Sequence, residues 1–148
     1  MHQFMKNNST LNILSKIIIF LAGFNFLIFE VSWNRILSLY LGSTVFASTL
    51  VLATFMGGIG FGGLLWGRYI NRQNPSKHLL GYLFAAIAIS GLGNYLLFQF
   101  GLPAMYKSLT TLSIATREAV VYTTAFSALI VAAFFMGGIL PVMAKILI

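Results

Sequence analysis

The sequence has no cysteine and only two acidic residues, and these absences remove most catalytic chemistry. Without a thiol the chain forms no disulfide, thiolate metal site or cysteine nucleophile. Glu30 and Glu118 are the only carboxylates, and Glu118 adjoins Arg117 as in a solvated surface pair, so no carboxylate dyad is predicted. The two histidines have no neighbouring ligand at metal-site spacing. The sequence therefore predicts no enzyme, no cofactor and no metal site.

Charge of either sign is scarce, since only 7% of the 148 residues are charged while 59% are hydrophobic. Soluble domains carry about 25% charged residues, and the mean hydropathy of +0.92 is far above theirs. The nine cationic residues are scattered among apolar runs and form no patch, which argues against nucleic acid as a partner. The composition therefore predicts an integral membrane protein whose cations act as topology signals.

Four long apolar runs divide the chain. An apolar helix of about 20 residues is long enough to cross a bilayer. The predicted helices cover about 16–41, 44–66, 79–100 and 119–140. Together they form one all-α domain over residues 1–148, an integral membrane bundle of four transmembrane helices in which every backbone polar group is satisfied.

The connections between these helices are short or polar. Gly42 and Ser43 predict a very short first turn. Segment 67–78 contains cationic and turn-forming residues, which predict a loop. In segment 101–118, Pro103 marks a break, and apolar residues at helical spacing follow it. This outer connection is therefore expected to be either an interfacial amphipathic helix or an ordinary loop.

The distribution of cations predicts how the bundle is oriented. Four spans place both ends of the chain on one side, where six cations are expected, against Lys107 and Arg117 on the other side. The excess places both termini in the cytoplasm, in a bacterial-type inner membrane. Arg68, Arg72 and Lys77 are predicted to anchor the helix ends, and the arginines to contact anionic lipid as an additional role. The six cations are Lys6, Lys16, Arg68, Arg72, Lys77 and Lys145.

The second predicted helix is rich in glycine. Glycines four positions apart let another helix pack directly against the backbone. The run FMGGI at 55–59 also recurs at 135–139, in the fourth helix. A phosphate-binding GxGxxG loop would need a strand before it and a soluble helix after it, and neither is predicted here. The predicted helix-packing residues are Gly57, Gly58, Gly62, Gly63, Gly67, Gly137 and Gly138.

Glu30, Asn34 and Arg35 are the polar residues that a membrane span does not explain. Counted from Lys16, Glu30 lies about 21 Å into the first helix, at a depth where an ionised carboxylate is costly. One hypothesis makes the three residues a binding site for a cation, a proton or a polyamine amine. The other makes Glu30 a satisfied polar anchor, with Arg35 reaching the outer headgroups. A partner on a neighbouring helix or on another protein is a further alternative for Glu30.

Three segments, LIFEVSWNRILSLYLGSTVFA (27–47), LATFMGGIGFGGLLWGRYINR (52–72) and FFMGGILPVMAK (134–145), share their order and spacing with one family. They resemble the membrane portion of the polytopic spermidine-synthase-like proteins, in which a helical bundle precedes a cytoplasmic aminopropyltransferase-like domain. The resemblance implies a membrane bundle alone, because the nucleotide loop and acidic amine-binding residues of that domain have no counterpart in this sequence. The residues that carry it are Glu30, Trp33, Arg35, Gly67, Arg68, Met136, Gly137, Gly138 and Pro141.

Two functional hypotheses follow from these features. The first is a non-catalytic accessory or scaffold subunit that packs against other membrane protein subunits of a larger complex. The alternative is a transporter or binding module for a polyamine or another cation, working as a homo-oligomer with Glu30 as its carboxylate. The repeat between the second and fourth helices is parallel and partial, whereas alternating access usually involves repeats of several helices. The accessory subunit is therefore the first hypothesis.

Overall fold

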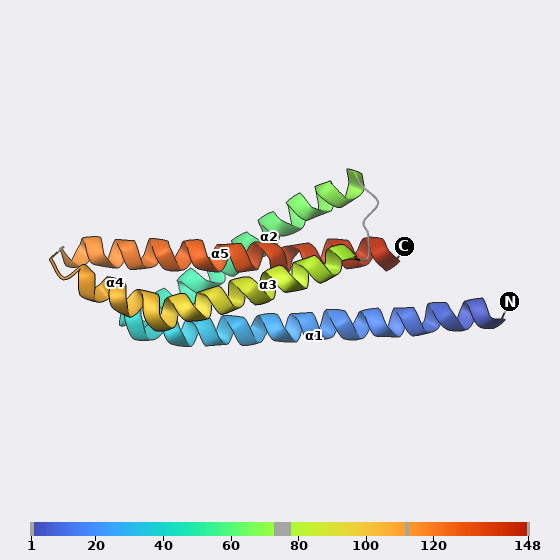
Figure 1. The fold of residues 1–148 in the computed structure, drawn as a ribbon, viewed down its shortest axis with the longest axis horizontal. Helices are drawn as coiled ribbons and strands as arrows, with labels where there is room; N and C mark the ends of the chain where they lie inside the picture. Colours follow the sequence, from blue (N-terminus) through green and yellow to red (C-terminus); the bar gives the residue numbers. More distant parts are fainter. Residues whose placement is uncertain (1, 73–77, 112, 148) are drawn as a thin grey trace.

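The computed structural model describes residues 2–72, 78–111 and 113–147, with side chains over 13–72, 78–111 and 113–146. These residues form an elongated bundle of helices, and no strand occurs among them (Figure 1). Four helices are long and apolar enough to cross a membrane, which confirms the predicted all-α membrane bundle. The elements are α1 (His2–Leu41), α2 (Thr44–Arg72), α3 (His78–Leu96), the π-helix η1 (Leu97–Gly101), α4 (Leu102–Ser108) and α5 (Ile114–Leu147).

Helix α5 lies at the centre of the bundle and α1 at its periphery. Half of the residues in the most apolar window of α5 (50%) are buried inside the chain, against 6% for α1. The most extensive helix–helix contact joins α2 and α5, which cross each other, while α3 runs alongside α5 (Figure 1). Much of the apolar surface of α1 is therefore left to contact lipid or another protein.

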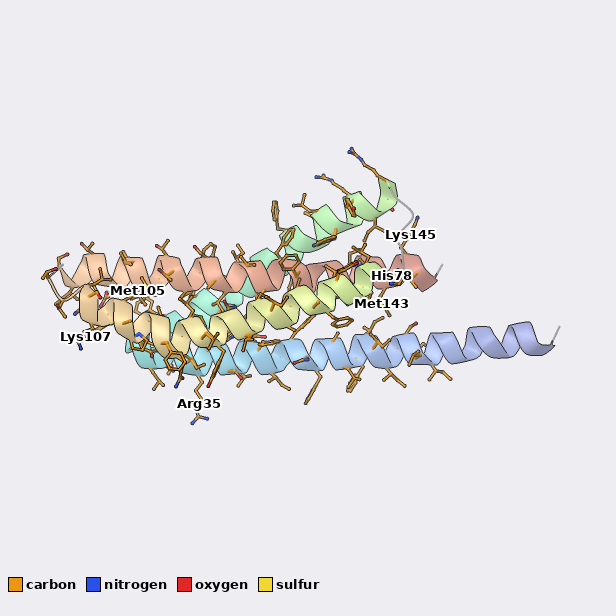
Figure 2. The ribbon with its side chains drawn as sticks, in the orientation of Figure 1. Arg35, His78, Met105, Lys107, Met143 and Lys145 are labelled. Atoms are coloured by element: carbon orange, nitrogen blue, oxygen red, sulfur yellow. The ribbon has the colours of Figure 1, made fainter. Side chains whose placement is uncertain are left out.

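The two ends of the described chain lie at the same end of the bundle. Helix α1 begins and α5 ends at this end, which we call the termini end (Figure 1). Lys145 and His78 lie there, whereas Lys107 lies at the opposite end (Figure 2). This arrangement is the one expected for an even number of spans. The side of the membrane that the termini end faces remains a prediction.

Three helices are longer than the sequence predicts. Helix α1 begins at His2 and not near residue 16, because no proline or glycine interrupts it before Gly23. Helix α2 continues to Arg72 through the start of the predicted loop 67–78; residues 73–77, including Lys77, lie outside the described residues. Helix α5 spans Ile114–Leu147 and passes through Pro141, which was expected to follow the end of the helix near residue 140. Proline removes only one backbone hydrogen bond, and neighbouring helices in a membrane compensate for it.

The first turn is confirmed. Leu41 ends α1 and Thr44 begins α2, and Gly42 between them has a φ angle of +63°. This left-handed conformation costs glycine nothing and is strained for other residues. Gly42 therefore reverses the chain with only two connecting residues.

The outer connection differs from both predicted alternatives. Helices η1 and α4 follow α3 without a break, so the third span continues to Ser108 and does not end near residue 100. Leu102, the first residue of α4, is fully buried. Pro103 lies in the first turn of α4, directly after the π-helix, and the helical segment continues through it. The helix after Pro103 is thus part of the third span and not a separate interfacial helix.

A tyrosine of α1 forms a hydrogen bond with the π-helix η1. The Leu102 N–H donates to the carbonyl of Leu97 and not to that of Phe98. Pro103 has no N–H to take over this role, so the carbonyl of Phe98 lacks its usual main-chain donor. The hydroxyl of Tyr40 donates to that carbonyl at 3.1 Å. The distortion in the third span and its hydrogen-bond partner on α1 therefore form one structural unit.

We expect Tyr40→Phe to lower the free energy of unfolding by about 1 kcal/mol, since one interhelical hydrogen bond is lost and a carbonyl is left unpaired. The measurement is unfolding in mixed detergent micelles followed by circular dichroism. Tyr82→Phe is the matched control, because Tyr82 is exposed on α3. An equal effect of the two substitutions would contradict this role for Tyr40.

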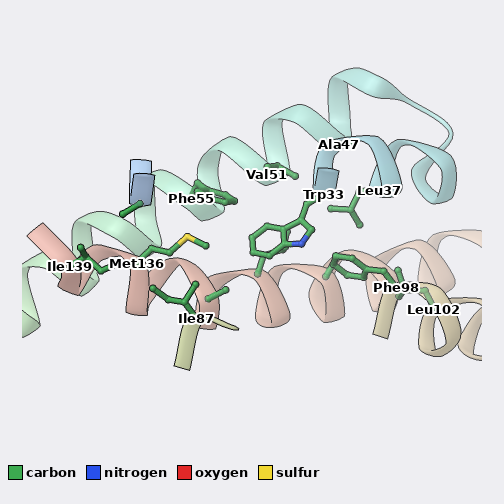
Figure 3. Close-up of a cluster of buried hydrophobic side chains, with 14 of the residues drawn as sticks. Trp33, Leu37, Ala47, Val51, Phe55, Ile87, Phe98, Leu102, Met136 and Ile139 are labelled. Atoms are coloured by element: carbon green, nitrogen blue, oxygen red, sulfur yellow. The ribbon is translucent and has the colours of Figure 1, made fainter. Parts of the chain in front are cut away.

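The core of the bundle surrounds Trp33 of α1. Its side chain is only 3% exposed and points between α2 and α5 (Figure 3). The ring centroid of Trp33 lies 5.2 Å from that of Phe29 and 5.3 Å from that of Phe55, distances typical of favourable aromatic pairs. Leu37, one turn further along α1, is fully buried beside it. Helix α1 therefore enters the core mainly through its C-terminal third.

Candidate functional site

At the crossing of α2 and α5, glycines let the two helices approach closely. A methyl group placed on Gly58 would lie 2.5 Å from the Cβ atom of Ala133, and one on Gly138 would lie 2.8 Å from Cδ1 of Trp66. A methyl group on Gly62 would overlap the carbonyl oxygen of Phe134. At Gly138 the Trp66 side chain would have to move, whereas at Gly62 the near atoms belong to the α5 backbone, so here the two helices are in backbone contact.

Carbonyl oxygens of one helix face glycine Cα atoms of the other at this crossing. The Cα hydrogens of Gly62 and Gly137 point to the carbonyl oxygens of Phe134 and Ile59, respectively. The position that a Cβ atom of Gly63 would occupy lies 3.5 Å from the carbonyl oxygen of Gly137, an ordinary van der Waals distance. Pro141 cannot donate to the Gly137 carbonyl four residues earlier, which leaves that oxygen available to α2.

Two glycines predicted to pack do not line this crossing. A methyl group on Gly57 would meet no atom within 4 Å, so the packing role predicted for Gly57 is wrong within this chain. A methyl group on Gly67 would lie 3.9 Å from Cβ of Pro141, which is an ordinary contact. Gly57 and Gly137 hold the same place in the two FMGGI runs, but only Gly137 faces the partner helix. The sequence repeat therefore does not produce equivalent environments.

The polar residues of α1 do not converge on one point, and of Glu30, Asn34 and Arg35 only Asn34 is hydrogen-bonded to the described part of α2. The Ser48 hydroxyl of α2 donates to Oδ1 of Asn34 at 3.1 Å. Glu30 is half-buried one helical turn before Asn34, while Arg35 is exposed and projects away from the bundle (Figure 2). The predicted group of Glu30, Asn34 and Arg35 is thus divided between two faces of α1.

Neither carboxylate has a charged partner among the described residues. No ion pair joins Glu30 to Arg35 in this part of the chain, consistent with their wide angular separation on the helix. Near the start of α5, the Arg117 guanidinium lies 4.5 Å from the ring centroid of Tyr106. Arg117 thus makes a cation–π contact and does not lie against Glu118. Over the described side chains, no group of three metal-ligating residues is present.

Two hydrogen bonds were not predicted from the sequence. They run from the Ser48 hydroxyl to Asn34 and from the Tyr40 hydroxyl to the Phe98 carbonyl. Ser48 and Asn34 lie at equal distances from Leu41 along the chain, so the tight turn brings them opposite each other. This symmetry was a usable signal. The Tyr40 contact had no such signal, because it depends on a π-helix that the sequence of the third span does not predict. Asn94 of α3 is also buried, at 4% exposure, and its Nδ2 has no hydrogen-bond partner among the described residues.

Comparison of the chain with protein-family models, curated proteins and solved structures finds no match. The resemblance to the membrane portion of spermidine-synthase-like proteins therefore stays a prediction.

Proposed function

We propose that the chain is a non-catalytic accessory subunit of a larger membrane complex, and that α1 is the helix that contacts the partner protein. Glu30 carries this proposal. It lies near the middle of the candidate span Ile13–Leu41, about 16 Å from the Leu41 end of the helix. It is half-buried on the most peripheral helix and has no charged partner among the described residues.

A carboxylate at this depth in a membrane is energetically unfavourable. An ionised acid in the middle of a membrane helix costs about 2.5–3.5 kcal/mol by insertion measurements. A cation or hydrogen-bond donor on a helix of another protein would offset that cost. The exposed apolar side chains of α1 before and after Glu30, such as Leu27 and Val31, provide a surface for such a helix.

An open groove between α1 and α3 supports the same assignment. Its volume is about 460 Å³, and its lining includes Leu21, Asn25 and Phe84. Asn25 adds a polar group to an otherwise apolar lining, and polar side chains join membrane helices through hydrogen bonds. Asn25 lies five positions before Glu30, on a different face of α1, so the groove offers a partner protein a second contact, separate from the Glu30 region.

A cation-binding module, with a polyamine amine as one ligand, is the second candidate. Glu30 would supply the carboxylate, and the hydrogen-bonded pair of Asn34 and Ser48 places two oxygen atoms about one turn away. The orientation expected for either function has the termini end in the cytoplasm of a bacterial-type inner membrane, as the positive-inside rule predicts.

Purification from native membranes in mild detergent, with mass spectrometry of the co-migrating proteins, tests the proposal. We expect wild-type protein and Glu118→Gln to retain a stoichiometric partner. Glu30→Gln is expected to lose at least about 90% of it, because a buried charge pair contributes more than 1.4 kcal/mol. Glu118 is a suitable control because it is exposed near the start of α5.

The opposite result is equally informative. A wild-type chain that migrates only as a homo-oligomer would contradict the accessory role. Equilibrium dialysis with spermidine would then test the second candidate. Binding that Glu30→Gln abolishes would establish it, and equal binding by both proteins would overturn it.

A further inference from the structure

An apolar groove opens beside α2 at the termini end of the bundle. The C-terminal part of α2 diverges from α5 and α3 in this region (Figure 1). The groove has a volume of about 370 Å³, within the range of small-molecule pockets. Its lining is apolar and aromatic and comes from three helices, with Leu65, Trp66 and Tyr69 of α2, Leu79 of α3 and Phe134 of α5.

Two arginines of α2, Arg68 and Arg72, adjoin the residues that line this groove along the helix. Leu65, Tyr69 and Arg72 are spaced so that they share one face of α2, and Arg68 lies next to that face. Both arginines are exposed, and Arg72 is the last residue of the second candidate span. The only two acidic residues of the chain, Glu30 and Glu118, belong to α1 and α5, so no carboxylate of α2 or α3 neutralises these cations.

We propose that this groove binds an anionic phospholipid, with an acyl chain along the groove and the phosphate held by Arg68 and Arg72. Guanidinium groups bind phosphate through paired hydrogen bonds. Trp66 and Tyr69 have the amphipathic character of side chains at the boundary between acyl chains and headgroups. An apolar groove with two exposed arginines beside it on α2 matches a molecule with an apolar tail and an anionic head.

A lipid fits this site better than a helix of another protein. The groove-lining Leu65 and the exposed Arg72 are two turns apart on α2, about 10 Å, which is the length scale of one lipid head and the start of its chain. The site is also separate from Glu30, so its assignment does not depend on the accessory role proposed above.

Trp66 provides a direct probe, because it lines the groove while Trp33 is only 3% exposed. The protein is reconstituted in phosphatidylcholine vesicles that contain a small fraction of brominated lipid, which quenches nearby tryptophans. We expect brominated phosphatidylglycerol to quench with a relative affinity at least about fivefold above that of brominated phosphatidylcholine, since each arginine near anionic lipid contributes on the order of 1 kcal/mol. Trp66→Phe should remove this preference.

Two variants separate the groove from simple surface charge. The double variant Arg68→Gln/Arg72→Gln should bring the two affinities to equality, whereas Lys107→Gln, an exposed cation at the opposite end, should leave the preference unchanged. Leu65→Phe with Leu79→Phe fills the groove and keeps both arginines, and it should also abolish the preference.

Three outcomes would overturn the assignment. They are equal quenching by both lipids in the wild type, a preference that survives removal of both arginines, and a preference that survives filling of the groove. The last outcome would mean that the arginines attract lipid as surface charges alone. Circular dichroism of each variant establishes that it is folded before quenching is measured.

Discussion

Replacing Gly62 by alanine is expected to destabilise the protein by about 2–3 kcal/mol, whereas the same replacement at Gly57 is expected to stabilise it by up to about 1 kcal/mol. Alanine has the higher helix propensity at both positions. At Gly62, however, the added methyl group overlaps the Phe134 carbonyl of α5, and a backbone atom cannot move aside as a flexible side chain can. At Gly57 the methyl group meets nothing within 4 Å.

The opposite signs make this comparison decisive. Both glycines belong to α2, so propensity effects cancel between them. The measurement is the free energy of unfolding in mixed micelles, obtained from titration with a denaturing detergent. If Gly62→Ala were as stable as Gly57→Ala, the backbone contact between α2 and α5 would be refuted.

Replacing Trp33 by alanine is expected to have the second large effect, a loss of about 3 kcal/mol and detachment of α1 from the bundle. Trp33 contacts Phe29 and Phe55 and fills the space between α2 and α5. Removing a buried aromatic side chain leaves a cavity whose walls lose their dispersion contacts. Because most of α1 is exposed, few other contacts would hold the helix in place.

Phe20→Ala provides the control for this effect, since Phe20 is also an aromatic residue of α1 but is 73% exposed. It is expected to change the free energy of unfolding by less than about 0.5 kcal/mol. Detachment of α1 can be followed by disulfide cross-linking between cysteines introduced at Asn34 and Ser48, which are hydrogen-bonded in the folded protein. Undiminished cross-linking in Trp33→Ala would show that other contacts anchor α1.

The sequence was sufficient to predict the number of membrane-spanning segments and the first turn, because hydropathy and a single glycine decide them. The helix limits were harder to predict. Pro141 was expected to mark an end, yet α5 continues through it because the α2 backbone lies against the carbonyl that the proline leaves unpaired. In the same way, Pro103 lies in the first turn of α4 and does not close the third span. Both errors arise because contacts between helices override local propensity.

For the candidate site, the sequence identified which residues are unusual but not which side of the helix each one presents to its neighbours. Four-residue spacing correctly indicated that glycines of α2 pack against a helix, but it did not distinguish Gly62 from Gly57, whose environments depend on the crossing geometry. Glu30 and Arg35 are close in the sequence, and only the rotation of α1 about its axis separates them. The orientation of a helix face is set by its neighbours, which a single sequence does not reveal.

The central position of α5 has a consequence for how the protein is made. Synthesis proceeds from the N-terminus, so α1, α2 and α3 enter the membrane before the helix around which they pack exists. During that interval the glycine surface of α2 faces lipid, and only contacts that do not involve α5 can adopt their final form, among them the α1–α2 hairpin closed by Gly42 and by the pair of Asn34 and Ser48. The bundle is therefore completed in one late step, when α5 inserts and displaces lipid from that surface.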